Sequence, residues 1–332
     1  MMGLSFPVLL LLVIGFFFGW LLLLKFKLLF ISLLALILGY KSIAVFIGFN
    51  APVSFTTQKQ TGAIRVVSWN VARFIELARN NNAGSNIRKK MLALLKEQKA
   101  DILCLQEFHT SENPGFYNNI RAIREELGFS YHYFPYDKDG DRNYYSSVIF
   151  SRFPIVDSAL LRYPRPSQPE VLVQADIQVN NDTIRVFTTH LQSQRFDKLD
   201  YARMQKIKSR EDSLVYHSIP IVAKLKRGIV IRSIQADIIG EVRSNSPYPV
   251  LFTGDLNDVP NSYTYFKVRG ELRDAFLEKG YGLGRTFRGL SPTLRIDYIF
   301  SDSRFSVAQF KREKKNYSDH YMLVADLQLN NP

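Results

Sequence analysis

Polar side chains with chemical potential recur in this chain directly after short apolar runs. Asn70, Glu107, His190 and Asp255 each occupy such a place. One polar residue there is commonly a turn former, but a repeated series of acidic, amide and histidine side chains indicates a shared site. Carboxylate oxygens suit Mg²⁺ or Mn²⁺, and histidines beside carboxylates suit proton transfer or charge stabilisation at a phosphate. The residue types therefore predict metal-assisted phosphate chemistry.

Composition excludes several other kinds of protein. The chain has 332 residues, of which 46% are hydrophobic, so it can bury a large core and is not a disordered chain. Its single cysteine excludes both an intrachain disulfide and a cysteine-based zinc site. The nucleophile elbow, the phosphate-binding P-loop and the paired-histidine zinc motif are missing from the sequence. A net charge of +13 favours anionic partners, namely nucleic acid, anionic lipid headgroups or phosphorylated substrates.

The elements that must position these residues follow from the apolar pattern. Residues 171–179 alternate between apolar and polar, which predicts a half-buried strand, and a turn at 180–182 leads to a second strand at 183–189. Strands outnumber helices and often follow one another directly, so we expect two sheets packed face to face with helices outside. The other predicted strands are 64–69, 102–106, 131–134, 147–151, 250–253 and 296–300, and the predicted helices are 85–98, 117–127 and much of 201–243.

The first fifty residues differ in composition from the rest. No charged side chain precedes Lys25, and a second apolar run follows Lys27. Each run is close to the ~20 residues that cross a hydrocarbon core. We therefore predict a membrane anchor over 1–50 with two transmembrane helices at about 4–24 and 28–49, a linker over 51–63, and a catalytic domain over 64–332. One span with an interfacial helix, or an uncleaved signal, is the alternative.

The two lysines between the apolar runs also predict sidedness. Positive charge prefers the cytoplasmic side of a membrane, so a turn bearing Lys25 and Lys27 would be cytoplasmic. With two spans, the catalytic domain would then lie outside the cytoplasm, as on the outer side of a bacterial inner membrane. A single span would reverse or blur this assignment.

Six separated motifs resemble those of the endonuclease/exonuclease/phosphatase superfamily, in the order that the superfamily has them. The resemblance covers about residues 64–328. Members include pancreatic-type deoxyribonucleases, abasic-site endonucleases, inositol-polyphosphate phosphatases and neutral sphingomyelinases. A seventh segment, after residue 150, is similar but follows a Ser-Ser pair where a glycine-bearing pair is common. The six motifs are Ser68-Trp69-Asn70, Gln106-Glu107, Thr189-His190-Leu191, Gly254-Asp255-Leu256-Asn257-Asp258, Arg295-Ile296-Asp297-Tyr298 and Ser318-Asp319-His320.

The resemblance implies a fold and a role for each matched residue. The fold is an α+β four-layer αββα sandwich, here preceded by a transmembrane helical hairpin, and the reaction is Mg²⁺- or Mn²⁺-dependent phosphoester hydrolysis. Glu107 would be the principal metal ligand, assisted by Asn70 and Asp319. Asp255 would activate the attacking water, and Asn257 would bind a phosphate oxygen. His320, oriented by Asp297, would contact the scissile phosphate. His190 would assist the leaving group, and both His190 and Asn70 would also touch the phosphate.

The sequence leaves the substrate open. A nuclease-like hydrolase fits the basic charge, whereas a membrane anchor fits a phospholipid, sphingomyelin or phosphoinositide substrate. The aromatic residues Tyr263, Tyr265, Phe266, Tyr281 and Phe287 are candidates for a substrate groove. A third hypothesis is a non-catalytic, membrane-held module that binds anions through Lys206, Lys208 and Arg210. The lipid bilayer is the expected partner, and no obligate protein partner is evident.

Overall fold

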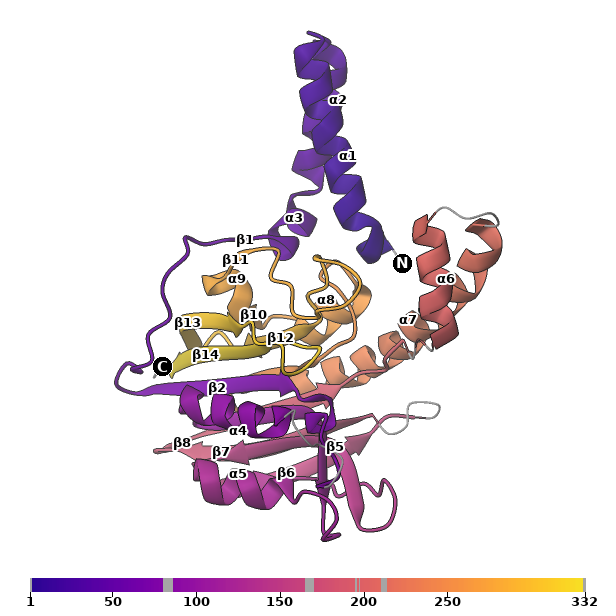
Figure 1. The fold of residues 1–332 in the computed structure, drawn as a ribbon. Helices are drawn as coiled ribbons and strands as arrows, with labels where there is room; N and C mark the ends of the chain where they lie inside the picture. Colours follow the sequence, from indigo (N-terminus) through magenta and orange to yellow (C-terminus); the bar gives the residue numbers. More distant parts are fainter. Residues whose placement is uncertain are drawn as a thin grey trace.

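Two six-stranded sheets face each other at the centre of the protein. The computed structural model describes residues 2–79, 86–164, 170–194, 196, 198–209 and 214–330. One sheet has the order β13-β14-β2-β3-β5-β4 and the other β10-β12-β9-β8-β7-β6 (Figure 1). The strands are β2 (Ala63–Asn70), β3 (Ile102–Ser111), β4 (Tyr131–Tyr133), β5 (Asn143–Ser151), β6 (Ile155–Arg162), β7 (Val171–Val179), β8 (Asp182–His190), β9 (Val250–Asp255), β10 (Arg273–Asp274), β12 (Asp297–Ser301), β13 (Phe305–Glu313) and β14 (Met322–Leu329).

The strand pattern explains why the sheets pack in this way. In β7, Val173, Ala175 and Ile177 point into the core between the sheets, while Leu172 packs in a separate core on the outer face. Such a strand is buried on both faces, as in a sheet covered on each side. Strand β2 is also buried on both faces. Its Val66 joins the core between the sheets, and its Val67 joins the outer core that is covered by the helices at 87–98 and 119–127.

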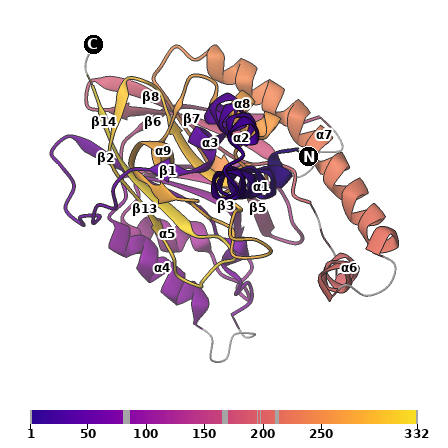
Figure 2. The same ribbon diagram turned by 90° about the horizontal axis from the view of Figure 1, so that it is seen from above.

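Helices cover the outer face of each sheet and complete four layers. On one side α4 (Ile87–Gln98) and α5 (Asn119–Leu127) pack on the first sheet; on the other, α7 (Leu214–Ser244) and α8 (Tyr263–Arg269) pack on the second (Figure 2). The Asn118 side chain accepts a hydrogen bond from the Arg121 amide at the start of α5, and Gly128 ends that helix with a φ of 74°. Shorter elements are η1 (Ala72–Phe74), α6 (Lys198–Ser209), α9 (Ala275–Lys279) and β11 (Tyr281–Gly282).

Strand direction brings the predicted site residues to one end of this sandwich. β2 is parallel to β3, with Asn70 opposite Gln106, and β8 is parallel to β9, with His190 opposite Asp255. The carboxyl ends of parallel neighbours lie at the same sheet edge. Because β12 is antiparallel to β9, Asp297 pairs with Asp255 at that edge too.

The N-terminal segment forms a helical hairpin that projects from the sandwich (Figure 1). Helix α1 (Met2–Leu22) has the length and hydropathy of a membrane span, and its 21 residues extend about 30 Å. The chain returns through α2 (Phe26–Leu38) to the domain. The predicted single helix over 28–49 is wrong: it breaks at Gly39, and α3 (Tyr40–Phe46) is bent by 60° from α2.

The base of the hairpin is packed against the domain, which explains that break. Val45 and Phe46 are buried, and the Arg295 guanidinium donates a hydrogen bond of 2.5 Å to the Val45 carbonyl. Strand β1 (Gly48–Phe49) then pairs with β11. Residues 51–62 have no regular helix or strand, but Lys59 in this segment forms an ion pair with Asp101. The hairpin is therefore held by direct contacts as well as by the predicted linker.

Candidate active site

Glu107 faces the cleft because strand β3 bulges at this point. The pairing of β3 with β5 shifts register between Leu105 and Phe108, and Glu107 has a φ of 49°. A bulge of this kind redirects a side chain away from the sheet surface. The carboxylate stays 28% exposed, and its Oε1 atom accepts a hydrogen bond of 3.1 Å from Asn70 Nδ2.

One oxygen of Asp255 lies at the centre of the cluster. Its Oδ2 atom accepts a hydrogen bond of 3.1 Å from Asn70 Nδ2 and lies 3.7 Å from His190 Nε2 and 3.6 Å from His320 Nε2. His190 Nε2 is also 3.6 Å from Glu107 Oε1. Burial raises the pKa of Asp255, and the nearby Asp297 charge adds to that effect, so this carboxylate is a stronger base than usual.

His320 and Asp297 form a hydrogen-bonded pair behind Asp255. His320 Nδ1 lies 2.9 and 3.0 Å from the two carboxylate oxygens of Asp297, and both residues are buried. Burial alone would lower the His320 pKa, but Asp297 and Asp255 outweigh it and raise that pKa to about 10. The imidazole is therefore a cation at neutral pH, with Nε2 directed toward Asp255.

Short hydrogen bonds fix the loop that carries Asp319 and His320. The Ser318 hydroxyl donates to the Asn70 carbonyl at 2.8 Å, and the Trp69 indole donates to the His320 carbonyl at 3.0 Å. The Phe287 ring lies 5.0 Å from the His320 ring. The 318–320 segment is thus tied to the end of β2 by bonds between residues 248 and 251 positions apart, which explains how distant segments reach one site.

Asn257 stands on a tight turn after β9. Its φ is 49°, and its backbone amide donates to Asp255 Oδ1 at 2.8 Å. Its side-chain amide donates to the Leu191 carbonyl at 2.9 Å. The turn holds Asp255 in place and brings Asn257 to the same cavity as the two histidines.

The structure brings all eight predicted site residues together. A cavity of about 280 Å³ is lined by Glu107, His190, Asp255, Asn257, Asp319 and His320. Asn70 and Asp297 contact these residues from behind, as the distances above show. Both polar atoms of the Asn70 side chain already have partners within the protein. Its Nδ2 atom donates to two carboxylates and its Oδ1 atom accepts from the Ala72 amide, so the structure favours a role in holding those carboxylates over the predicted role as a metal ligand.

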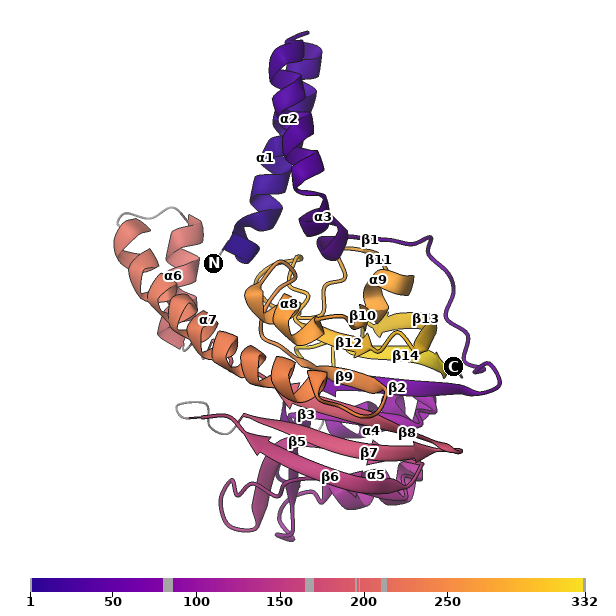
Figure 3. The ribbon, with the colours of Figure 1, turned by 180° about the vertical axis from the view of Figure 1, so that it is seen from behind.

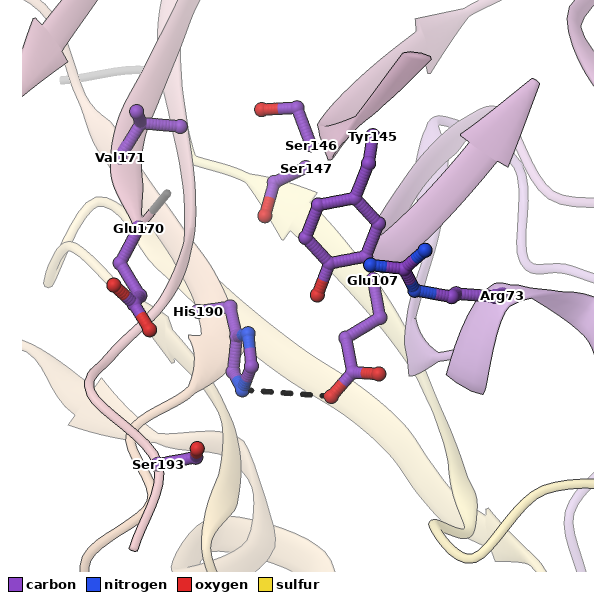
Figure 4. A pocket seen from close by; sticks show the side chains of 9 residues that line it. All are labelled: Arg73, Glu107, Tyr145, Ser146, Ser147, Glu170, Val171, His190 and Ser193. Carbon is purple, nitrogen blue, oxygen red and sulfur yellow. Dashed lines mark ion pairs between the residues drawn. The ribbon is translucent and has the colours of Figure 1, made fainter. Parts of the chain in front are cut away.

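A second cavity of about 220 Å³ adjoins the first and shares Glu107, His190 and Ser193 with it. Figure 4 shows Arg73, Tyr145, Ser146, Ser147 and Glu170 around it. The Arg73 guanidinium stacks 4.1 Å from the Tyr145 ring centre. Sequence reasoning missed Arg73 and Tyr145. Arg73 lies in a turn whose residues 72–75 all have positive φ, and no residue pattern signals that turn.

Several other sequence predictions change. Of the five aromatic candidates for a groove, Phe287 lines the larger cavity, whereas Tyr265 is buried in the core beneath α8. Tyr263, Phe266 and Tyr281 are exposed and are not among the residues that line either cavity. The predicted cap Ser85, and Arg210 of the basic cluster, lie outside the described residues.

The donor set fits a hard divalent cation. Glu107, Asp255 and Asp319 bring three carboxylates to one cavity, and within the described part of the chain none of them forms an ion pair with a lysine or arginine. Ligand atoms of Asp255, Asp297 and His320 also lie within 4.8 Å of one another. We favour Glu107 and Asp319 as ligands, because His320 Nδ1 is already committed to Asp297 and the part-exposed Glu107 faces the cleft.

Solved structures share this fold. An endonuclease/exonuclease/phosphatase from Beutenbergia cavernae superposes with a TM-score of 0.57 at 20% identity, covering 82% of this chain and 72% of that chain. Humanized D. rerio TDP2 gives 0.56 at 18% identity, covering 81% and 100%. The human Nocturnin catalytic domain, solved with bound sulfate, gives 0.54 at 17% identity, covering 82% and 95%.

A match to a family profile identifies the family of this chain. No curated protein matches the chain, but the profile of the Endonuclease/Exonuclease/phosphatase family matches residues 67–320. That range includes every one of the eight clustered residues. The chain therefore belongs to the endonuclease/exonuclease/phosphatase family, whose members are metal-dependent phosphoester hydrolases.

Proposed function

We propose that this protein is a membrane-held hydrolase that uses Mg²⁺ or Mn²⁺ to cleave a phosphoester by in-line attack of water. The observation that carries the proposal is the cluster of Glu107, Asp255, His190 and His320 around one cavity. Glu107 and Asp319 would hold the cation, which when bound would neutralise charge developing on the phosphate. A membrane position is supported by α1, which has the properties of a span.

The chain's own residues have complementary roles in this reaction. Asp255, with its raised pKa, accepts the proton of the attacking water while the new oxygen–phosphorus bond forms. The His320 cation, oriented by Asp297, faces the phosphate and stabilises its growing negative charge. His190 lies beside both carboxylates and protonates the leaving oxygen as the old phosphorus–oxygen bond breaks. Asn257 and Asn70 position the phosphate and the two carboxylates.

The test is hydrolysis of bis(p-nitrophenyl) phosphate by the full chain in detergent, with Mg²⁺ or Mn²⁺ and then with EDTA. Glu107→Gln keeps the size of the side chain and removes its charge, so we expect turnover to fall at least about 100-fold, as when a group that stabilises the transition state is removed. Glu112→Gln, five residues beyond Glu107 and exposed, is the matched control and should stay active. Activity that survives EDTA, or survives in Glu107→Gln, contradicts the proposal.

A further inference from the structure

The larger cavity joins the catalytic cluster to the membrane-side hairpin. Besides the catalytic side chains it is lined by Leu4 of α1, by Leu225 of α7, and by Val259, Phe287 and Leu290 from loops. One wall is therefore made by the first turns of the proposed membrane span. These apolar side chains share the lining with Ser193, Gln194, Arg232 and Asp258, and a phosphate alone does not require them.

The position of Leu4 is set by tight packing. A Cβ atom built on Gly3 would lie 2.8 Å from the Asn261 carbonyl oxygen, so the start of α1 contacts the loop before α8 at backbone distance. The Phe6 ring packs edge-on against Phe46 at 5.3 Å. From there α1 leads away from the domain (Figures 1 and 3), and its next apolar side chains, such as Val8 and Leu11, are exposed. The apolar wall of the cavity thus continues onto the surface of α1 that we propose faces lipid.

The cavity offers little to a nucleic acid backbone. Among the described residues that line it, Arg232 is the single lysine or arginine, and its guanidinium is already bonded to Asp258 and to the Gln192 carbonyl. Nucleic acid grooves need several cations to neutralise successive phosphates. Cations line the neighbouring cavities, namely Arg73, Lys224 and Arg227, but the charge within this one favours a substrate with a single phosphate over a nucleic acid backbone.

Two further helices carry exposed apolar side chains on the hairpin side of the sandwich. Helix α6 and the first half of α7 rise on the same side of the sandwich as the hairpin (Figures 1 and 3). Leu199, Ile219 and Val222 on these helices are exposed, and Lys226 and Arg227 are exposed next to them. Exposed apolar side chains beside basic ones are typical of a helix that lies in an anionic lipid interface.

From these observations we infer that the substrate is a membrane phospholipid, with its phosphate among His190, Asn257 and His320 and its acyl chains along Leu4, Leu225 and Leu290. This inference rests on the proposed function. A lipid could enter from the bilayer beside α1 without crossing water. Hydrolysis would form one bond from water oxygen to phosphorus and break one phosphorus–oxygen ester bond, with the water proton passing to Asp255 and the leaving alcohol oxygen taking a proton from His190.

The experiment compares three kinds of substrate on the same enzyme. The full chain in detergent receives bis(p-nitrophenyl) phosphate, plasmid DNA, or mixed micelles of one dioleoyl phospholipid, taken in turn from phosphatidic acid, phosphatidylglycerol and phosphatidylethanolamine. The double variant L4Q/L290Q makes the apolar wall polar without touching the catalytic cluster. V53Q/V156Q changes two exposed valines away from the cavity and is the matched control.

We expect L4Q/L290Q to lose about tenfold or more in kcat/KM on the cleaved phospholipid, the size of effect that hydrophobic pocket contacts give. Its activity on bis(p-nitrophenyl) phosphate, and both activities of the control, should stay unchanged. Equal loss on both substrates, or cleavage of plasmid DNA but of no lipid, overturns the lipid inference and leaves the hydrolase standing. Failure to cleave any of these substrates contradicts the proposed function itself.

Discussion

The His320 imidazole lies between two carboxylates that keep it charged. Asp297 holds Nδ1, and Asp255 lies 3.6 Å from Nε2. Burial acts in the opposite direction on the His320 pKa, because burial alone would favour the neutral ring. The balance gives a cation at neutral pH where a phosphate would be recognised, and Asp297 is the first of the two carboxylates that maintain it.

Asp297→Asn removes the larger of the two charge effects on His320. Burial then weighs more heavily and the His320 pKa falls from about 10 toward its ordinary value. The cation is lost as pH rises through that pKa, so we expect the alkaline limb of the kcat/KM profile to move to lower pH in the variant. The profile with bis(p-nitrophenyl) phosphate measures this, with Asp157→Asn on exposed β6 as control. An unmoved alkaline limb would refute this role for the pair.

The sequence allowed the eight predicted residues to be named as one group, because strand ends and ordered motifs are visible there, and the structure places them together. Their roles in the reaction stay predictions. Arg73 and Tyr145 could not. Their approach depends on the left-handed turn at 72–75 and on β5 lying beside the β3 bulge, and both are properties of backbone geometry. The amide orientation of Asn70 was equally hidden, because it follows from two carboxylates converging on one nitrogen atom.

At the scale of elements, two parallel strand pairs carry the site. Close approach of β8 and β9 depends on Gly254, which has a φ of 151°. The sequence predicted both strands but also a straight second apolar helix. In that run Gly39 and the nearby Lys41 stand at the break, but the bend itself follows from long-range packing of Val45 and Phe46 on the domain, which the sequence does not show.

Gly254→Ala should weaken this strand pair. A Cβ atom at this position would lie 2.3 Å from the Thr189 carbonyl oxygen, which is backbone and cannot rotate away. We expect a loss of about 2 kcal/mol in the free energy of unfolding, in the range for backbone strain and overpacking. Gly115→Ala, whose nearest atom is a side-chain oxygen at 3.4 Å, is the control. Equal urea midpoints for the two variants would show that β8 and β9 tolerate a side chain here.

At the scale of the whole molecule, the hairpin and the catalytic domain have a fixed relation. Helix α1 starts beside the cavity, which Leu4 lines, and the chain turns at the far tip between α1 and α2 before it returns to the domain (Figure 1). The predicted sidedness, with the tip on the cytoplasmic side and the domain on the other, requires that α2 and α3 cross the membrane together as one bent span. The sequence predicted the two apolar runs but not that the first one helps to build the cavity wall, which is a contact between distant segments.

Cysteine labelling in spheroplasts tests that sidedness. Native Cys104 is fully buried and burial raises its pKa to about 12, so it should give little background. An impermeant maleimide should label Lys96→Cys on the exposed face of α4 in intact spheroplasts, but label Lys25→Cys only after permeabilisation. The reverse pattern would place the domain in the cytoplasm.

The central claim is that the cluster of Glu107, Asp255, His190 and His320 activates a water molecule to attack the phosphorus atom of a phosphoester. The most direct measurement is hydrolysis of bis(p-nitrophenyl) phosphate by the full chain with Mg²⁺ in water enriched in heavy oxygen, followed by mass spectrometry of both products. We predict that the heavy oxygen appears in the p-nitrophenyl phosphate and is missing from the nitrophenol, and that EDTA abolishes the reaction. Heavy oxygen in the nitrophenol, or no metal-dependent product, would contradict the account.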